Sequence, residues 1–367
     1  MHSTVLLVLL LGVVSSVSAD RSTRKRPYEA SCPERCRCTA NVLDCRNAKL
    51  TKEDLETVQP QAFVELDTID FYGAKLGDVS DGIFPEGVLH PMVTQANFTN
   101  CGITRISSKT FAQLPNLEFL DLSGNVIDYA GRSTFESTKK LKRVDLTHAL
   151  RKRSTDQSNA DLLAQMFDGQ GRDYLVELGE VILNKNDLKF VHSSTFCKIR
   201  GLSRIHLADN QLSSFDVQES CMKDLKLLDI SGNNFVILTS SFWDHLKELT
   251  SLDISRNPLN CTCALQPFFK IVKDEMDDFL NQGLTTCAGP ESLKGKNLFD
   301  LKEDLCVLEG EATKGGYGFG TFFLLALIAG GVLFAYRHYR TRRRHDVPFE
   351  FGYSGLEADD EVQPEFV

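Results

Sequence analysis

The feature that most constrains this chain of 367 residues is a short apolar motif that recurs along most of its length. Residues 120–125 read LDLSGN, residues 228–233 read LDISGN and residues 252–257 read LDISRN. The last position of the motif recurs at Ala74, Cys101, Asn125, Ala149, Asn186, Asn210, Asn233 and Asn257, with gaps of 27, 24, 24, 37, 24, 23 and 24 residues. A period of this kind predicts a stack of similar units, each covered by its neighbours.

The motif has the L-x-x-L-x-L-x-x-N-x-L form of leucine-rich repeats. We therefore expect an α/β solenoid of about eight repeats, each with one short parallel strand. The Asn amides should satisfy backbone groups buried at the turns, and the Cys101 thiol can fill the same position. Phenylalanines recur on the returning segments and predict an aromatic spine of Phe111, Phe135, Phe196 and Phe242.

Two further apolar segments lie near the ends of the chain. Residues 5–14 are followed by small residues ending at Ala19, which predicts a signal peptide over 1–19. Residues 315–336 contain no charge and reach about 33 Å as a helix, which is enough to span a membrane. Five arginines follow within residues 337–344, so the positive-inside rule predicts a type I single-pass protein of the plasma membrane with a cytoplasmic tail.

The eleven cysteines point to an oxidising compartment. Four of them, Cys32, Cys36, Cys38 and Cys45, precede the first repeat, and Cys261, Cys263, Cys287 and Cys306 follow the last. Spacing alone leaves three pairings open for each group of four, and zinc binding is the alternative use of such clusters. Cys197 and Cys221 occupy nearly the same place in adjacent repeats, where either a disulfide or two buried thiols would fit.

These signals divide the chain into ten segments. They are a signal peptide (1–19), a short linker (20–31), an N-terminal cysteine-rich cap (32–50), a first group of repeats (51–149), a polar insertion (150–174), a second group of repeats (175–259), a C-terminal cysteine-rich cap (260–308), a juxtamembrane linker (309–314), a transmembrane helix (315–336) and a cytoplasmic tail (337–367). The insertion opens with three basic residues and then reads ADLLAQMF, which is typical of a helix. It could be a solvated loop, a protease site or a binding element.

The residues between the ladder leucines should face the concave side of the sheet. One column reads Asp70, Asn97, Asp121, Asp145, Ile182, His206, Asp229 and Asp253, which is either a groove for a basic ligand or the ordinary Asp of this repeat. We expect a ligand surface on the second half of the array, at Asp145, Lys185, His206, Asp229 and Arg256. His206 and Asp229 have no nucleophile or third ligand beside them, so the sequence predicts neither an enzyme nor a metal or cofactor site.

Two Asn-x-Thr sequons begin at Asn97 and Asn260. A glycan on Asn97 would cover the first part of the concave face, so a ligand should bind elsewhere. The middle residue of the second sequon is Cys261, a cap cysteine. The net charge of −9 gives no basic excess for binding nucleic acid.

The predicted tail carries two short motifs. Tyr353 and Leu356 fit the Tyr-x-x-hydrophobic pattern that clathrin adaptors read, and a solvated linker or a phosphorylated tyrosine is the alternative. The chain ends Glu365, Phe366, Val367, which could enter the groove of a PDZ protein.

The cysteine patterns resemble the caps of extracellular leucine-rich-repeat proteins. This resemblance implies disulfides joining Cys32 to Cys38, Cys36 to Cys45, Cys261 to Cys287, and Cys263 to Cys306.

The 27-residue gap, the insertion, a cap ending TTCAGPESLKGKNLFDLKEDLC, one membrane span and a short tail together resemble the trophoblast-glycoprotein family over about residues 32–340. That family implies a cell-surface glycoprotein that dampens Wnt/β-catenin signalling through a Wnt co-receptor. The chain departs from the family at its C-terminal residues, and it has Phe268 and Phe269 near a position where Trp is usual. The alternative is an adhesion or matrix-organising receptor without Wnt activity, which needs only a scaffold, a glycan and an anchor.

Overall fold

The computed structural model describes residues 26–151, 158–169, 174–216, 218, 221–239, 246, 248–275, 278–301, 304–307 and 327–338, with the side chains of 271–275 and 278 left out. The chain divides into two units, Met1–Cys306 and Val307–Val367. In the second unit, residues 327–338 are helical. Among the described residues, no helix has both the length and the apolar content needed to span a membrane. Residues 315–326 of the predicted span, the predicted signal peptide and the two tail motifs lie outside the described residues.

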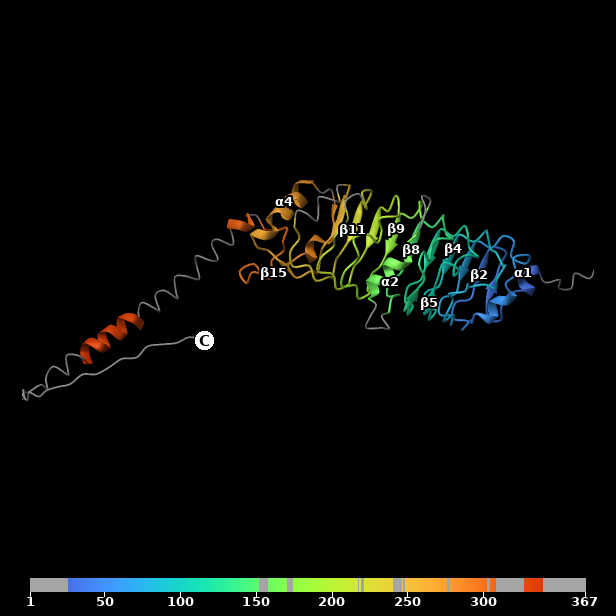
Figure 1. Cartoon of the computed structure of the whole chain (residues 1–367), viewed down its shortest axis with the longest axis horizontal. Coiled ribbons are helices and arrows are strands. Elements are labelled where there is room, and N and C mark those ends of the chain that lie inside the picture. The colour runs from blue at the N-terminus through green and yellow to red at the C-terminus, as the bar shows by residue number, and fades with distance from the viewer. Residues whose placement is uncertain are drawn as a thin grey trace, which may run out of the picture. The chain divides into compact units, whose positions relative to one another are not determined.

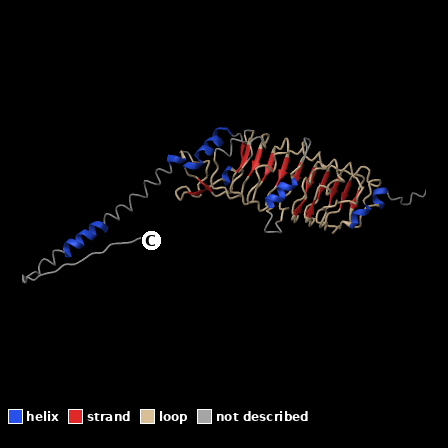
Figure 2. Cartoon of the chain, in the orientation of Figure 1, coloured by secondary structure: helices blue, strands red, loops and turns tan. Residues whose placement is uncertain are grey.

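The first unit is built on one long sheet of short strands. The sheet has eleven strands in the order β1-β2-β3-β4-β6-β8-β9-β10-β11-β12-β14, and only the β1–β2 pair is antiparallel. Figure 1 shows these strands side by side in chain order, and Figure 2 shows loops forming most of the remaining backbone. The strands are β1 (Arg37–Cys38), β2 (Val42–Asp44), β3 (Thr68–Asp70), β4 (Gln95–Asn97), β6 (Phe119–Asp121), β8 (Arg143–Asp145), β9 (Glu180–Ile182), β10 (Arg204–His206), β11 (Leu227–Asp229), β12 (Ser251–Asp253) and β14 (Asp278–Phe279).

The predicted repeat register is present strand by strand. The eight repeat strands (β3, β4, β6, β8, β9, β10, β11 and β12) pair without a shift. The N-terminal cap extends the sheet by β2 and β1, and the C-terminal cap extends it by β14. The middle residue of each strand points into the core, as Leu120 and Leu228 do, and the flanking residues point to the other face. We call that other face the concave face.

The buried Asn ladder joins successive repeats. Asn210 donates from Nδ2 to the carbonyl oxygens of Leu183 and Leu207, and its Oδ1 accepts from the backbone N–H of Asn186 and Leu188. Cys101 occupies the same position, and its thiol donates to the carbonyl oxygen of Phe71 at 3.0 Å. Burial raises the pKa of the Cys101 thiol to about 12, so this position holds an inert thiol, as expected.

The returning segments contain less helix than the expected α/β fold class requires. Within the described part of the first unit, α-helix occurs in α1 (Pro27–Ala30) at the N-terminal end, in α2 (Asn159–Met166), in α4 (Gln266–Glu275) and at residues 305–306 of the C-terminal cap. Elsewhere in the described residues, the returns are turns, short 3₁₀ segments at Glu53–Thr57 (η1), Cys263–Leu265 (η2) and Gln282–Leu284 (η3), and two small parallel sheets. Those sheets pair β5 (Arg105–Ile106) with β7 (Tyr129–Ala130) and β13 (Leu259–Asn260) with β15 (Cys287–Gly289). The fold is therefore a β-solenoid, because 24 residues per repeat leave little length for a helix.

The insertion contributes to the core instead of lying in solvent throughout. Of its residues, 150–151, 158–169 and 174 are described. Ser158 caps α2 together with Asp161, and the helix buries Leu162, Leu163 and Met166. Phe167 follows and packs between Phe135 and Phe196, with ring centroids 5.3 and 5.5 Å away. The aromatic spine thus runs through the insertion by way of a residue that the repeat spacing did not predict. Phe242, expected in the same spine, lies outside the described residues.

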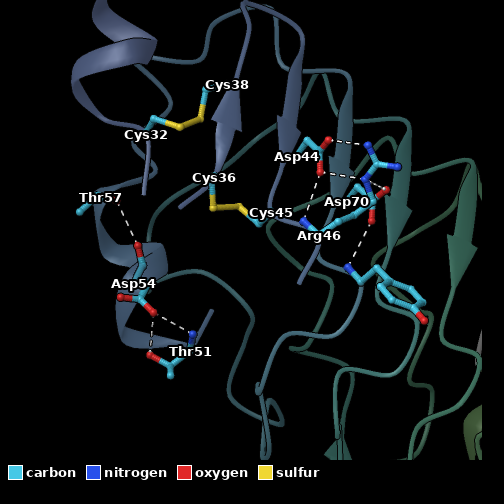
Figure 3. Close-up of a disulfide and its surroundings, with 11 residues drawn as sticks. Cys32, Cys36, Cys38, Asp44, Cys45, Arg46, Thr51, Asp54, Thr57 and Asp70 are labelled. Carbon is cyan, nitrogen blue, oxygen red and sulfur yellow. Dashed lines mark hydrogen bonds and ion pairs between the residues drawn. A yellow bond between two sulfur atoms is a disulfide. The ribbon is translucent and has the colours of Figure 1, made fainter. Parts of the chain in front are cut away.

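Disulfides close both caps. At the N-terminal end Cys32 is bonded to Cys38 and Cys36 to Cys45 (Figure 3). At the C-terminal end Cys261 is bonded to Cys287 and Cys263 to Cys306. These are the pairs that the resemblance implies. Cys197 and Cys221 are also bonded, across adjacent repeats.

In the C-terminal cap, Phe268 is fully buried and Phe269 nearly so, so that α4 contributes two rings to the end of the core.

Candidate binding surface

The first half of the concave face carries a row of carboxylates. Asp44, Asp70, Asn97, Asp121 and Asp145 follow one another in register on adjacent strands. Partial burial raises the pKa of Asp70 above its ordinary value, and the negative charges of Asp44 and Asp121 act in the same direction. The Arg46 guanidinium lies 2.7 Å from Asp44 and 3.5 Å from Asp70, and so neutralises the first end of the row (Figure 3).

A second group of charges lies at the middle of the array, on β8, β9 and β10. We call Arg143, Glu180, Arg204 and His206 the central charged cluster. The Glu180 carboxylate lies 3.7 Å from Arg143, 3.5 Å from Arg204 and 3.3 Å from the Nε2 of His206. The side chain of Glu180 is only 15% exposed, whereas those of Arg143 and Arg204 are 48% and 49% exposed. One recessed carboxylate is therefore shared by two guanidinium groups that keep N–H donors available to a partner.

Asp229 continues this cluster on the next strand. Its carboxylate lies 3.9 Å from Nδ1 of His206, and its Oδ1 accepts from the backbone N–H of Ser231. Burial raises the pKa of Asp229, but the neighbouring His206 ring and the hydrogen bonds from Ser231 outweigh burial and hold the pKa below its ordinary value. Asp229 is therefore ionised at neutral pH and gives the cluster a fixed negative edge.

The other predicted ligand residues lie around this centre. Lys185 and Arg256 are exposed at the turns after β9 and β12, both with left-handed backbone (φ 59° and 56°). Arg256 reaches back across one repeat to Asp209, at 3.4 Å, and to the Ser231 hydroxyl. Asp145 lies apart from His206, because the nearly buried Ile182 stands between them in the column.

The structure thus brings His206 and Asp229 into contact and puts Arg256 one repeat further on, with Lys185 and Asp145 at the margins. Arg143, Glu180 and Arg204 were not among the ligand residues predicted from the sequence. Their signal is a charged residue at the first strand position in three consecutive repeats, which is visible once the register is fixed.

The two sequons sit in different settings. Asn97 lies on the concave face at the end of β4, and its Oδ1 accepts from the backbone N–H of Thr99 at 2.9 Å. Asn260 lies in β13, beside the C-terminal cap and next to the disulfide-bonded Cys261. In the described parts of the chain, no group of three or more His, Cys, Asp and Glu side chains is arranged to hold a metal ion.

Repeats, register and disulfide-closed caps define a leucine-rich-repeat protein. No family model matches the chain. Among curated proteins, it is similar to mouse and human CD180 antigen, each 26% identical over 212 and 217 residues. It spans about a third of the length of these relatives, with 32% of each covered.

The chain is also similar to trophoblast glycoprotein. The relative from Macaca fascicularis is 23% identical over 302 residues, which cover 77% of this chain and 69% of that protein. The crystal structure of human trophoblast glycoprotein, also titled Wnt-activated inhibitory factor 1, matches with a TM-score of 0.63 at 22% identity and covers 75% of this chain and 99% of that one. The resemblance to a trophoblast-glycoprotein-like leucine-rich-repeat protein is confirmed.

Proposed function

We propose that this protein is a cell-surface receptor whose ectodomain binds a protein ligand or co-receptor through the second half of its concave face. The central charged cluster carries this proposal. Two half-exposed guanidinium groups stand beside the ionised Asp229, on a sheet whose short strands fix their spacing. Such a mixed-charge surface fits a protein partner with both acidic and basic side chains, because opposite charges align the partner as it approaches.

The topology belongs to the same proposal. Residues 1–19 act as a signal peptide, residues 315–336 cross the plasma membrane, and the arginines after residue 336 keep the tail in the cytoplasm. Five disulfides in the described ectodomain support passage through an oxidising compartment. Binding needs no cofactor, and the cluster offers a partner charge and hydrogen bonds instead of a nucleophile.

Charge reversal of the cluster tests the binding site. The probe is the secreted ectodomain, ending at residue 307 and fused to a dimerising tag, applied to a panel of cultured cell lines. Arg143→Glu together with Arg204→Glu should abolish the binding seen for the wild-type ectodomain. Asp229→Lys with Arg256→Glu should weaken it strongly. Lys139→Glu, an exposed change on a returning segment, is the matched control and should bind normally. Full binding by both double variants would refute the assignment.

By similarity to trophoblast glycoprotein, whose structure is titled Wnt-activated inhibitory factor 1, we propose that the consequence of binding is lower Wnt/β-catenin signalling. The partner would then be a Wnt co-receptor. Expression of the full chain should lower a β-catenin reporter, and the Arg143→Glu, Arg204→Glu variant should not. If the reporter is unchanged while expressing cells aggregate or spread on matrix, the adhesion receptor is the correct alternative.

The tail would set how long the protein stays at the surface. Tyr353 and Leu356 would engage a clathrin adaptor, whereas Glu365, Phe366 and Val367 would engage a PDZ protein. The two contacts act in opposite directions, since one removes the protein from the surface and the other retains it.

A further inference from the structure

The first half of the concave face holds a hollow with no assigned role. Its volume is about 440 Å³, and it is lined by residues of β3, β4, β6 and β8, among them Asp70, Gln95, Asn97, Phe119 and Asp121. Arg143 and Asp145 form its β8 side, where it borders the central charged cluster. We propose that this hollow seats the first sugar of an N-linked glycan on Asn97, packed against the ring of Phe119. The inference rests on the secretory route in the proposed function, and it goes further by assigning the occupant of this part of the face.

The position of Asn97 in β4 directs its amide into the hollow. Asn97 is partly exposed between Asp70 and Asp121, while its neighbour Phe98 is fully buried on the opposite side of the strand. The backbone N–H of Thr99 donates to Oδ1 at 2.9 Å, and Nδ2 has no hydrogen-bond partner among the described residues. The amide is therefore held by its oxygen, and the nitrogen that would carry a glycan is the free end.

Phe119 supplies an apolar surface beside that nitrogen. It is 43% exposed, although most of the phenylalanines of the repeats are buried. The register pairs Gln95 with Phe119 and Asn97 with Asp121, so Phe119 is the diagonal neighbour of Asn97 on the next strand. Diagonal neighbours lie about 7–8 Å apart, within reach of an aromatic ring. A sugar on Nδ2 can therefore lay the apolar C–H face of its ring on Phe119, and cover carbon surface that water now meets.

Polar groups around the hollow match the remaining groups of a sugar. The Oδ1 of Asp121 accepts from the backbone N–H and the hydroxyl of Ser123, while its Oδ2 has no partner in the described part of the chain. Oδ2 can accept from a sugar hydroxyl or from the N-acetyl N–H. Gln95, exposed on the same strand as Asn97, can both donate and accept. The hollow thus pairs an apolar ring with hydrogen-bonding groups, which is the combination that a sugar presents.

The modification itself is ordinary secretory chemistry at an Asn-x-Thr sequon. A bond forms between Nδ2 and C1 of the first sugar, and the bond between C1 and the pyrophosphate of the lipid-linked donor breaks. The amide proton leaves with the pyrophosphate group. The reaction precedes folding, and the fold then brings Phe119 to the attached sugar.

A glycan seated in the hollow would limit where a partner can bind on the concave face. A seated glycan covers Asp70 and Asp121, so the carboxylate row is closed to a basic ligand. Partners are thereby restricted to the part of the face from Arg143 onward.

The test uses the full-length chain produced in mammalian cells and purified in detergent. A glycan-releasing amidase is applied to the native and to the denatured protein. The rate of glycan release from Asn97 in the native protein is divided by the rate in the denatured protein. Phe119→Ala should raise this ratio several-fold, and Phe119→Tyr, which keeps a ring, should leave it low. Phe190→Ala is the matched control, because Phe190 is a similarly exposed phenylalanine (41%) outside the hollow, and it should change nothing.

A melting experiment provides the second readout. Phe119→Ala should lower the Tm of the glycosylated protein by about 2–4 °C and leave the Tm of the Asn97→Gln protein unchanged. An unmodified Asn97 by peptide mass, or equal effects of Phe119→Ala with and without the glycan, would overturn the proposal. Arg143 borders both the hollow and the central charged cluster, whereas Arg204 and Asp229 do not line the hollow. Normal binding after charge reversal at Arg204 or Asp229 would therefore count against the proposed function alone.

Discussion

Replacing Asn233 by alanine should destabilise the ectodomain by about 3 kcal/mol, and the structure shows where that loss arises. Asn233 is 4% exposed. Its Oδ1 accepts from the backbone N–H of Leu212 at 2.9 Å, and its Nδ2 donates to the carbonyl oxygens of Leu207, Ile230 and Ser231. The side chain therefore joins two repeats through backbone groups that water does not reach.

The four contacts contribute unequally. The carbonyl of Leu207 also accepts from Asn210, and that of Ile230 also accepts from Asn257, so both keep a donor after the substitution. The N–H of Leu212 has no second acceptor in the described part of the chain and would be left unpaired, which costs about 1–3 kcal/mol. The three Nδ2 bonds go to carbonyls that each keep another donor, so their loss adds about 0.5 kcal/mol each. With about 1.5 kcal/mol for the unpaired N–H, the total is about 3 kcal/mol.

Urea unfolding of the ectodomain, followed by circular dichroism, measures this loss. Asn234→Ala is the adjacent control, since Asn234 is exposed and its side chain makes no hydrogen bond among the described residues. It should change the free energy of unfolding by less than about 0.5 kcal/mol. Equal effects of the two substitutions would refute the role of the buried ladder.

Three other outcomes are expected. Cys306→Ser should lower stability by about 2–5 kcal/mol and reduce secretion, because it opens the cap disulfide with Cys263, and normal secretion with unchanged melting would contradict this. The depressed pKa of Asp229 stabilises the fold above the ordinary Asp pKa of 3.8, and this contribution is lost as pH falls through the lower folded-state pKa. The Tm of Asp229→Ala should therefore fall less than that of the wild type in acid below about pH 4, and parallel curves would argue against it. In antibody-uptake assays, Tyr353→Ala should slow internalisation and deletion of Val367 should speed it, and unchanged rates would leave neither tail contact in use.

Much of the fold could be predicted because its determinants are local and repeated. An apolar residue at every inward position and an Asn at five of the eight turns specify the strand register, and Cys101 is recognised only because it falls in that register. The predicted fold class, an α/β solenoid, contained too much helix, because the repeat motif specifies the strand and says little about the returning segment. Phe167 was missed for a related reason: it stands inside an insertion, where the period that identifies its counterparts is broken.

The residues of the proposed binding surface were only partly predictable from the sequence. His206 and Asp229 were found because they share a column. Glu180, which gathers Arg143 and Arg204 around it, depends on how long side chains bend toward one carboxylate, and the spacing of repeats does not encode this. Phe119 was passed over because a phenylalanine in a strand is usually read as core, although here it faces outward.

The most direct test of the binding surface is to block it with a sugar. Asp229→Asn creates the sequon Asn-Ile-Ser at residues 229–231 on the concave face, and Glu136→Asn creates Asn-Ser-Thr at residues 136–138 on an exposed returning segment. Once mass spectrometry shows both new sites occupied, binding of the two tagged ectodomains to the same cells is compared with that of the wild type. The account predicts that the glycan at residue 229 abolishes binding and that the glycan at residue 136 leaves it unchanged. Undiminished binding with residue 229 glycosylated would contradict it.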